Sequence, residues 1–126
     1  MINGLFSDSY YVASKKMLDV TALRQEAIAS NLANVETPNY KRMDVSSTFE
    51  SQLQQAVGGG DVNQIDSMQP SLSQDVTSNP GRSDGNTVQL EDEMLKMNQN
   101  VVEHALETQL VSASLMRMRM AITGKS

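Results

Sequence analysis

The stretch that decides the fold is residues 90–122, LEDEMLKMNQNVVEHALETQLVSASLMRMRMAI. One row of positions in it recurs in alternating steps of four and three, the heptad spacing of a helix that packs along another helix. The row is polar only at His104 and Thr108, and its other members are Leu90, Met94, Met97, Val101, Val111, Leu115, Met118 and Ile122. A second row runs beside it through Leu95, Val102, Leu106, Gln109, Ala113, Met116 and Met120. Two neighbouring rows predict that this helix, expected over residues 88–122, packs against more than one partner helix.

The sequence marks both the start and the end of this helix. Asp84-Gly85 predicts a turn, and Asn86 or Thr87 is expected to cap the first amides. Three acids at residues 91–93 complement the helix dipole at the amino end. Gly124 is expected to end the helix and leave a short basic tail.

The amino-terminal region predicts a second long helix over residues 7–35, which contain no Gly or Pro. Its apolar residues form two stripes on roughly opposite sides. One stripe holds Tyr11, Leu18, Ala22, Ala29, Leu32 and Ala33, and the other holds Val12, Val20, Leu23 and Ala27. Pro38 lacks an amide donor and disfavours helical angles at Thr37, so the helix is expected to end near residues 34–36.

The segment between the two helices is polar and acidic. Residues 44–84 hold six acids and one base, so the whole formal charge of −5 belongs to them and the flanks are neutral. Only residues 47–57 indicate a helix, with Phe49, Leu53 and Val57 on one face. The rest, including the three glycines at 58–60, predicts an extended and mobile linker.

Composition excludes several classes of function. The chain has no cysteine, so thiolate nucleophiles, disulfides and cysteine-ligated zinc are ruled out. No region has the surplus of lysine and arginine that nucleic-acid binding requires. We find no apolar run long enough to span a membrane and no cleavable signal peptide at the start.

Candidate chemical residues have simple structural explanations. His104 is the only histidine and lacks a second imidazole or a thiolate with which to hold a metal. The consecutive acids at 91–93 point in different directions on a helix, so they are expected to complement the dipole rather than bind a cation. No set of nucleophile, base and orienting residue can be assembled, which predicts a protein that is not an enzyme and uses no cofactor, metal or small-molecule substrate.

The predicted fold is all-α. Two long terminal helices form a coiled-coil-like hairpin, and a long polar, largely irregular connector contains one short helix near 47–57. We divide the chain into residues 1–43, 44–86 and 87–126. A hairpin hides only one face of each helix, so the remaining apolar residues are expected to contact other subunits. The expected interface residues are Leu18, Ala22, Ala29, Leu32, Leu90, Met94, Met97, Val101, Val111, Leu115, Met118 and Ile122.

Two motifs resemble the bacterial flagellar rod and hook axial protein family. Residues 30–35, SNLANV, followed by TPNYK at 37–41, are similar to the amino-terminal signature of that family. Residues 84–88, DGNTV, are similar to the segment that opens the terminal helix in its proximal rod subunits. The resemblance covers both ends of the chain and implies that Asn31, Asn34, Thr37, Pro38 and Tyr40 form a signature turn with a packing role.

The resemblance also implies a function. Family members are exported through the flagellar type III apparatus without a cleaved signal, and they assemble around a central channel to transmit torque. The implied location is the periplasmic rod of the basal body. The implied partners are other rod subunits, an adaptor protein at the rod base, a membrane-embedded ring and the export apparatus, with no nucleic acid. A cytoplasmic helical adaptor or chaperone-like protein is the alternative that the residues alone leave open.

Overall fold

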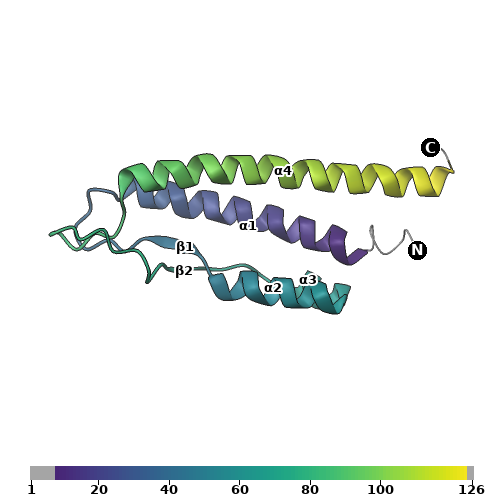
Figure 1. The fold of residues 1–126 in the computed structure, drawn as a ribbon, viewed down its shortest axis with the longest axis horizontal. Coiled ribbons are helices and arrows are strands. Elements are labelled where there is room, and N and C mark those ends of the chain that lie inside the picture. The colour runs from purple at the N-terminus through teal and green to yellow at the C-terminus, as the bar shows by residue number, and fades with distance from the viewer. Residues whose placement is uncertain (1–7, 125–126) are drawn as a thin grey trace.

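A computed structural model describes residues 8–124 of the chain. The helix α1 (Asp8–Ala33) and the helix α4 (Leu90–Thr123) lie side by side and antiparallel, which confirms the predicted hairpin (Figure 1). Gly124 adopts the left-handed conformation at the carboxyl end of α4, as its position predicts. The predicted helix start at Ser7 and the basic tail at Lys125 lie outside the described residues.

The connector contains more regular structure than the sequence predicts. The expected short helix is present as α2 (Ser47–Gly59), and a second one, α3 (Val62–Ser67), follows it directly. Gly60 has a φ of 73° and ends α2, so the glycine run is a helix terminus rather than a flexible linker. The Asp61 side chain then accepts hydrogen bonds from the Asn63 and Gln64 amides and caps α3.

Two short strands close the connector. The strand β1 (Met43–Val45) pairs antiparallel with β2 (Leu72–Gln74), so that Met43 lies opposite Gln74 and Val45 opposite Leu72. Each strand has only three residues, too few for the alternating pattern by which a strand is recognised. The pairing brings the connector back alongside α1 instead of leaving it extended.

The hydrophobic core lies between α1 and this folded connector. Its buried members are Val20, Val45, Phe49, Leu53, Ala56 and Ile65. Val12 and Leu23 of the second α1 stripe pack against the same cluster. The expectation that apolar residues left outside the hairpin contact other subunits is therefore wrong for the second α1 stripe, because the connector of the same chain covers it.

The elements form three layers. In Figure 1, α1 lies between α4 on one side and the connector with α2, α3 and the strand pair on the other. The helix α4 accordingly presents one face to α1 and leaves most of its circumference open. Within residues 8–124, no helix combines the length and apolarity required to cross a bilayer.

Candidate functional site: the hairpin junction and the open faces of α4

The signature turn lies where the chain leaves α1. Thr37 and Tyr40 close a turn through a hydrogen bond from the Tyr40 amide to the Thr37 carbonyl (3.3 Å). Pro38 and Asn39 occupy its centre, and Asn39 has a φ of 63°. Proline followed by a residue with positive φ is the combination that a type II turn requires, and asparagine tolerates that conformation better than most residues.

Asn31 joins the end of α1 to both neighbouring segments. Its amide nitrogen donates to the Met43 carbonyl and to Glu93 Oε1, each at 2.8 Å. Its amide oxygen accepts from the Met43 amide (3.0 Å) and from the Tyr40 hydroxyl (3.1 Å). Asn31 is fully buried, and these four hydrogen bonds use its donors and its acceptor completely. Asn34 makes the adjoining contacts, since its side chain accepts from the Thr37 hydroxyl and donates to the Ser30 carbonyl.

A buried ion pair completes what we call the polar junction, formed by Asn31, Tyr40, Arg42 and Glu93. Arg42 Nε donates to Glu93 Oε2 at 2.8 Å, and the two side chains are 3% and 1% exposed. The same guanidinium also contacts Asp44 (3.0 Å) and Asp75 (2.8 Å). Glu93 therefore fixes α4 to the turn. From the sequence it was expected only to complement the helix dipole, so this role was not predicted. No local pattern shows this role, because 51 residues separate the two partners.

Charge pairing also shifts the titration of the surrounding acids. Burial disfavours ionisation of Asp44, but hydrogen bonds from the Val45 amide, Arg42 and Arg24 outweigh it and hold the pKa below its usual value. Asp75 has a lowered pKa in the same way, with hydrogen bonds from Thr77 and Arg42 overcoming its burial. Both carboxylates are thus ionised acceptors at neutral pH.

Asn86 binds the end of α1 rather than the start of α4. Its amide nitrogen donates to three carbonyls, those of Asn34, Val35 and Thr37, at 2.8–3.1 Å. The prediction that Asn86 or Thr87 caps α4 is wrong, because the N-cap residue is Gln89, which makes no side-chain capping bond. Asn86 thus shares these carbonyls with other donors, because the Thr37 amide donates to Asn34 and Arg82 donates to Val35. This contact ties the segment before α4 to the signature turn.

The face of α4 toward α1 is unexpectedly polar. Asn100 donates to the Thr21 carbonyl (2.9 Å) and to Gln25 Oε1 (3.1 Å), while its own Oδ1 is buried without a hydrogen-bond partner. His104 Nδ1 lies 2.9 Å from the Thr21 hydroxyl, which donates to the Leu18 carbonyl. This hydrogen bond joins His104 of α4 to Thr21 of α1, a structural role.

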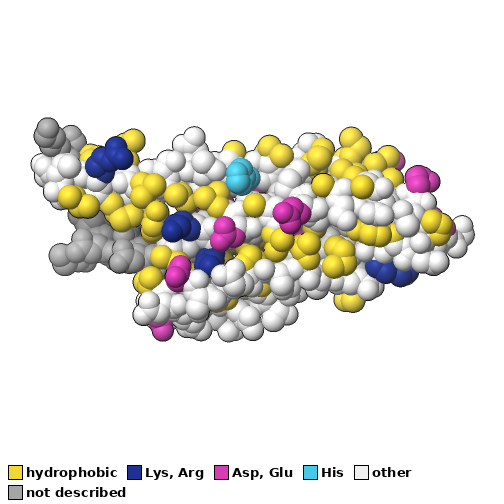
Figure 2. Space-filling view, turned by 180° about the vertical axis from the view of Figure 1, so that it is seen from behind, with side chains coloured by type: hydrophobic (Ala, Val, Ile, Leu, Met, Phe, Trp, Pro, Cys, Tyr) yellow, Lys and Arg dark blue, Asp and Glu magenta, His cyan; other side chains and the backbone are white. Residues whose placement is uncertain are grey.

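The predicted interface residues divide between the inside of the hairpin and its surface. Leu18, Leu32, Met97, Val111 and Met118 are half-buried. The others are exposed: Ala22, Ala29, Leu90, Met94, Val101, Leu115 and Ile122. A cavity of about 340 Å³ is lined by Ala22 and Gln25 of α1 and by Val101 and His104 of α4, so exposed members from both helices meet on one side of the hairpin. Figure 2 shows hydrophobic side chains along this face, with the histidine among them.

Arg24 holds the opposite side of the hairpin together. Its guanidinium pairs with Glu50 of α2 and Asp44 of β1, and lies 3.7 Å from Glu103 of α4. Desolvation lowers the pKa of Arg24, but the hydrogen bonds that Arg24 donates to Glu50 and Asp44 outweigh it and raise the pKa above its usual value. Arg24 precedes the motif at residues 30–41, and nothing in the sequence pattern predicts this bridge.

These features define a helical-hairpin structural subunit with a rigid polar turn and an apolar helix open to partners. Comparisons agree with that class. A family model described as flagella basal body rod protein matches residues 18–41. The chain is 34% identical over 114 residues to the flagellar basal body rod protein FlgB of Borrelia hermsii, covering 75% of this chain and 82% of that protein. It is 28% identical over 116 residues to FlgB of Aeromonas hydrophila, covering 86% of this chain and 88% of that protein.

The chain belongs to the FlgB family of flagellar basal body rod proteins. A shorter match, 46% identical over 52 residues, is to FlgB of Borreliella burgdorferi and covers 41% of this chain and 37% of that protein. The protein is accordingly a structural subunit of the proximal rod and not an enzyme. Membership in this family sets aside the alternative of a cytoplasmic adaptor or chaperone-like protein.

Proposed function

We propose that this chain assembles into the proximal rod through the open faces of its terminal helices, packing on other rod subunits. Eleven of the thirteen large hydrophobic side chains found exposed among residues 8–124 lie on α4. Burial of one such side chain stabilises an interface by roughly 1.5–3 kcal/mol. An apolar surface of this extent on one helix marks a protein interaction site.

The interface residues proposed from the heptad rows fit this surface. Leu90, Met94, Val101, Leu115 and Ile122 are between 45% and 86% exposed and lie on one row of α4. Ala22 and Ala29 are small residues on the adjoining side of α1, where a neighbouring helix could approach closely. In the assembled rod, this contact would extend to the half-buried members of the predicted interface, which are Leu18, Leu32, Met97, Val111 and Met118.

The mechanical part of the proposal rests on the polar junction. Torque would pass along α4, a continuous helix of 34 residues, and be resisted where Glu93, Arg42 and Asn31 fix it to α1. We propose that residues 1–43 and 87–126 carry assembly around the export channel, while residues 44–86 brace α1. The proposed setting is the periplasmic rod, reached through the type III export apparatus without signal cleavage. A rod-base adaptor and a membrane-embedded ring are the other proposed neighbours.

Substitution of an exposed apolar residue on α4 tests the proposal. Leu115 is 47% exposed, so Leu115→Asp leaves the fold of the free chain largely intact and places a charge in the proposed interface. We expect loss of motility and of rods in basal-body preparations, with an unchanged circular dichroism spectrum of the free chain. Val76→Asp is the matched control, because Val76 is 84% exposed and lies outside α4. Normal motility and rod yield with Leu115→Asp would refute assembly through this face.

A further inference from the structure

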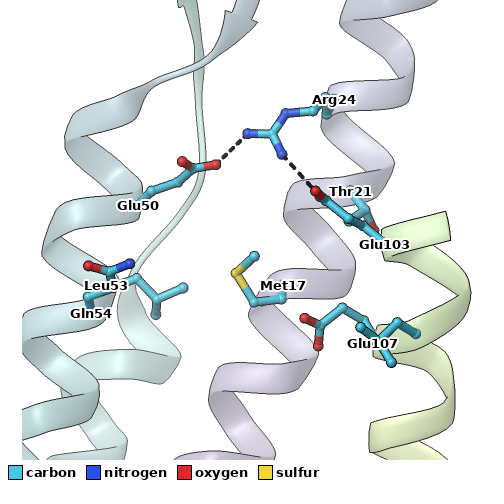
Figure 3. Close-up of a pocket in the computed structure, with 9 residues that line it drawn as sticks. Met17, Thr21, Arg24, Glu50, Leu53, Gln54, Glu103 and Glu107 are labelled. Atoms are coloured by element: carbon cyan, nitrogen blue, oxygen red, sulfur yellow. Dashed lines mark hydrogen bonds and ion pairs between the residues drawn. The ribbon is translucent and has the colours of Figure 1, made fainter. Parts of the chain in front are cut away.

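A groove lies between α2 and α4, with α1 as its floor. It has a volume of about 340 Å³ and is lined by residues from all three helices. Figure 3 shows Met17 of α1 between Leu53 on one side and Glu107 on the other, with Arg24 closing one end. Leu106 of α4 also lines the groove and is 58% exposed. The apolar part of the lining therefore comes from Met17, Leu53 and Leu106.

The groove carries a negative charge. Glu50, Glu103 and Glu107 line it, and Arg24 is the one cation among the lining residues. Arg24 contacts Glu50 and Glu103, but the structure shows no ion pair for Glu107 among residues 8–124. Burial and the nearby Glu103 raise the pKa of Glu107. A cation placed beside Glu107 would relieve this repulsion.

The far end of α4 has complementary chemistry. Residues 111–123 contain Arg117 and Arg119 and no acid. On the same helix end, Met116 is 64% and Met120 is 38% exposed. Figure 1 shows this end at one extremity of the molecule, extending beyond α1, with the loops that precede α4 at the other extremity. It thus presents methionines, which adapt to irregular apolar surfaces, beside two guanidinium groups.

We propose that the groove between α2 and α4 receives the carboxyl end of α4 from a second copy of this chain, with Met120 against Leu106 and Arg119 against Glu107. This contact rests on the proposed assembly function and names one head-to-tail interface within it. The groove and the helix end are different surfaces of the subunit, so the contact is heterologous. Repeated contacts of this kind link subunits into a ring or an open helical array rather than a closed two-fold dimer, and the open helical array is the geometry that a rod needs.

Disulfide trapping tests the contact directly, because the natural chain has no cysteine. One full-length variant carries Leu106→Cys and a second carries Met120→Cys with a size tag. Mixed at high concentration under mild oxidation, they should give a mixed disulfide dimer. Val76→Cys replaces Leu106→Cys in the control mixture, since Val76 is exposed and outside the groove. A yield with Leu106→Cys no greater than with Val76→Cys would overturn the proposal.

A charge reversal in the same assay tests the pairing of Arg119 with Glu107. Adding Arg119→Glu to the Met120→Cys chain should slow trapping about fivefold, the upper range for one exposed ion pair. Adding Glu107→Lys to the Leu106→Cys chain should restore the rate with Arg119→Glu and slow it with the natural Arg119. Equal trapping rates in all four combinations would overturn the charge pairing. The Leu115→Asp motility test does not depend on the outcome of the trapping assay. Failure of the head-to-tail contact is therefore distinguishable from failure of the assembly proposal.

Discussion

The buried pair of Arg42 and Glu93 gives the sharpest test of how the hairpin is fixed. Glu93→Gln keeps the size of the side chain and removes its charge, leaving Arg42 at 3% exposure without its most buried partner. Breaking a buried pair on one side costs about 3–5 kcal/mol. Asp44 and Asp75 still contact the guanidinium, so we expect the lower end, about 3 kcal/mol.

The assay is urea denaturation of the full chain followed by circular dichroism at the helix band. For a small protein the free energy of unfolding falls by about 1–3 kcal/mol per molar urea, so the midpoint should drop by about 1–3 M. Glu91→Gln is the matched control, because Glu91 lies two positions earlier on an exposed part of α4 and should shift the midpoint little. Arg42→Gln combined with Glu93→Gln should cost less than the sum of the single changes. A Glu93→Gln shift no larger than that of Glu91→Gln would refute the junction.

Two further predictions concern the turn and the pH response. Gly85 has a φ of 79°, and a Cβ there would collide with the Asn39 side chain. Gly81 has a similar φ of 72° but open space around it, so Gly85→Ala should lower the thermal midpoint more than Gly81→Ala. Equal effects of the two substitutions would remove the collision as a cause. The lowered pKa values of Asp44 and Asp75 mean that the unfolded chain binds more protons in acid, so their stabilisation is present above about pH 4 and is lost as pH falls through the folded-state values. Melts from pH 7 to pH 2.5 should show this loss, and Asp44→Asn should flatten the curve; an unchanged slope would contradict the assignment.

The long helices follow from the sequence because their signals are local and extended. Heptad spacing over residues 90–122 and the lack of Gly and Pro in residues 7–35 are enough to predict α4 and α1. The structure differs in which face of α4 meets α1. Most members of both apolar rows are exposed, although Met97, Val111 and Met118 are half-buried. The two buried residues of α4 are polar, Glu93 and Asn100. Apolar spacing predicts that a helix has partners, but it does not say which partner takes which face.

The contacts that hold the junction could not be predicted from spacing. Glu93 finds Asn31 and Arg42 across more than 50 residues, and Asn86 reaches the end of α1 across a similar distance. Such pairs depend on the path of the connector, which short helices and three-residue strands define. The start of α3 did have a local signal in Asp61. An aspartate directly after a glycine run can cap a helix that begins where the preceding helix ends.

The most direct test of assembly through α4 is amide hydrogen exchange in the free chain and in isolated basal bodies. In the free chain, amides near Glu93 and Asn100 should be protected by the junction, whereas residues 105–123 should exchange fast because their side chains are mostly exposed. In the rod, the amides of residues 105–123 should become at least about a hundredfold slower, as expected when about 3 kcal/mol of interface stabilises that segment. Equal exchange of residues 105–123 in the two states would contradict the proposal that α4 forms the contacts between subunits.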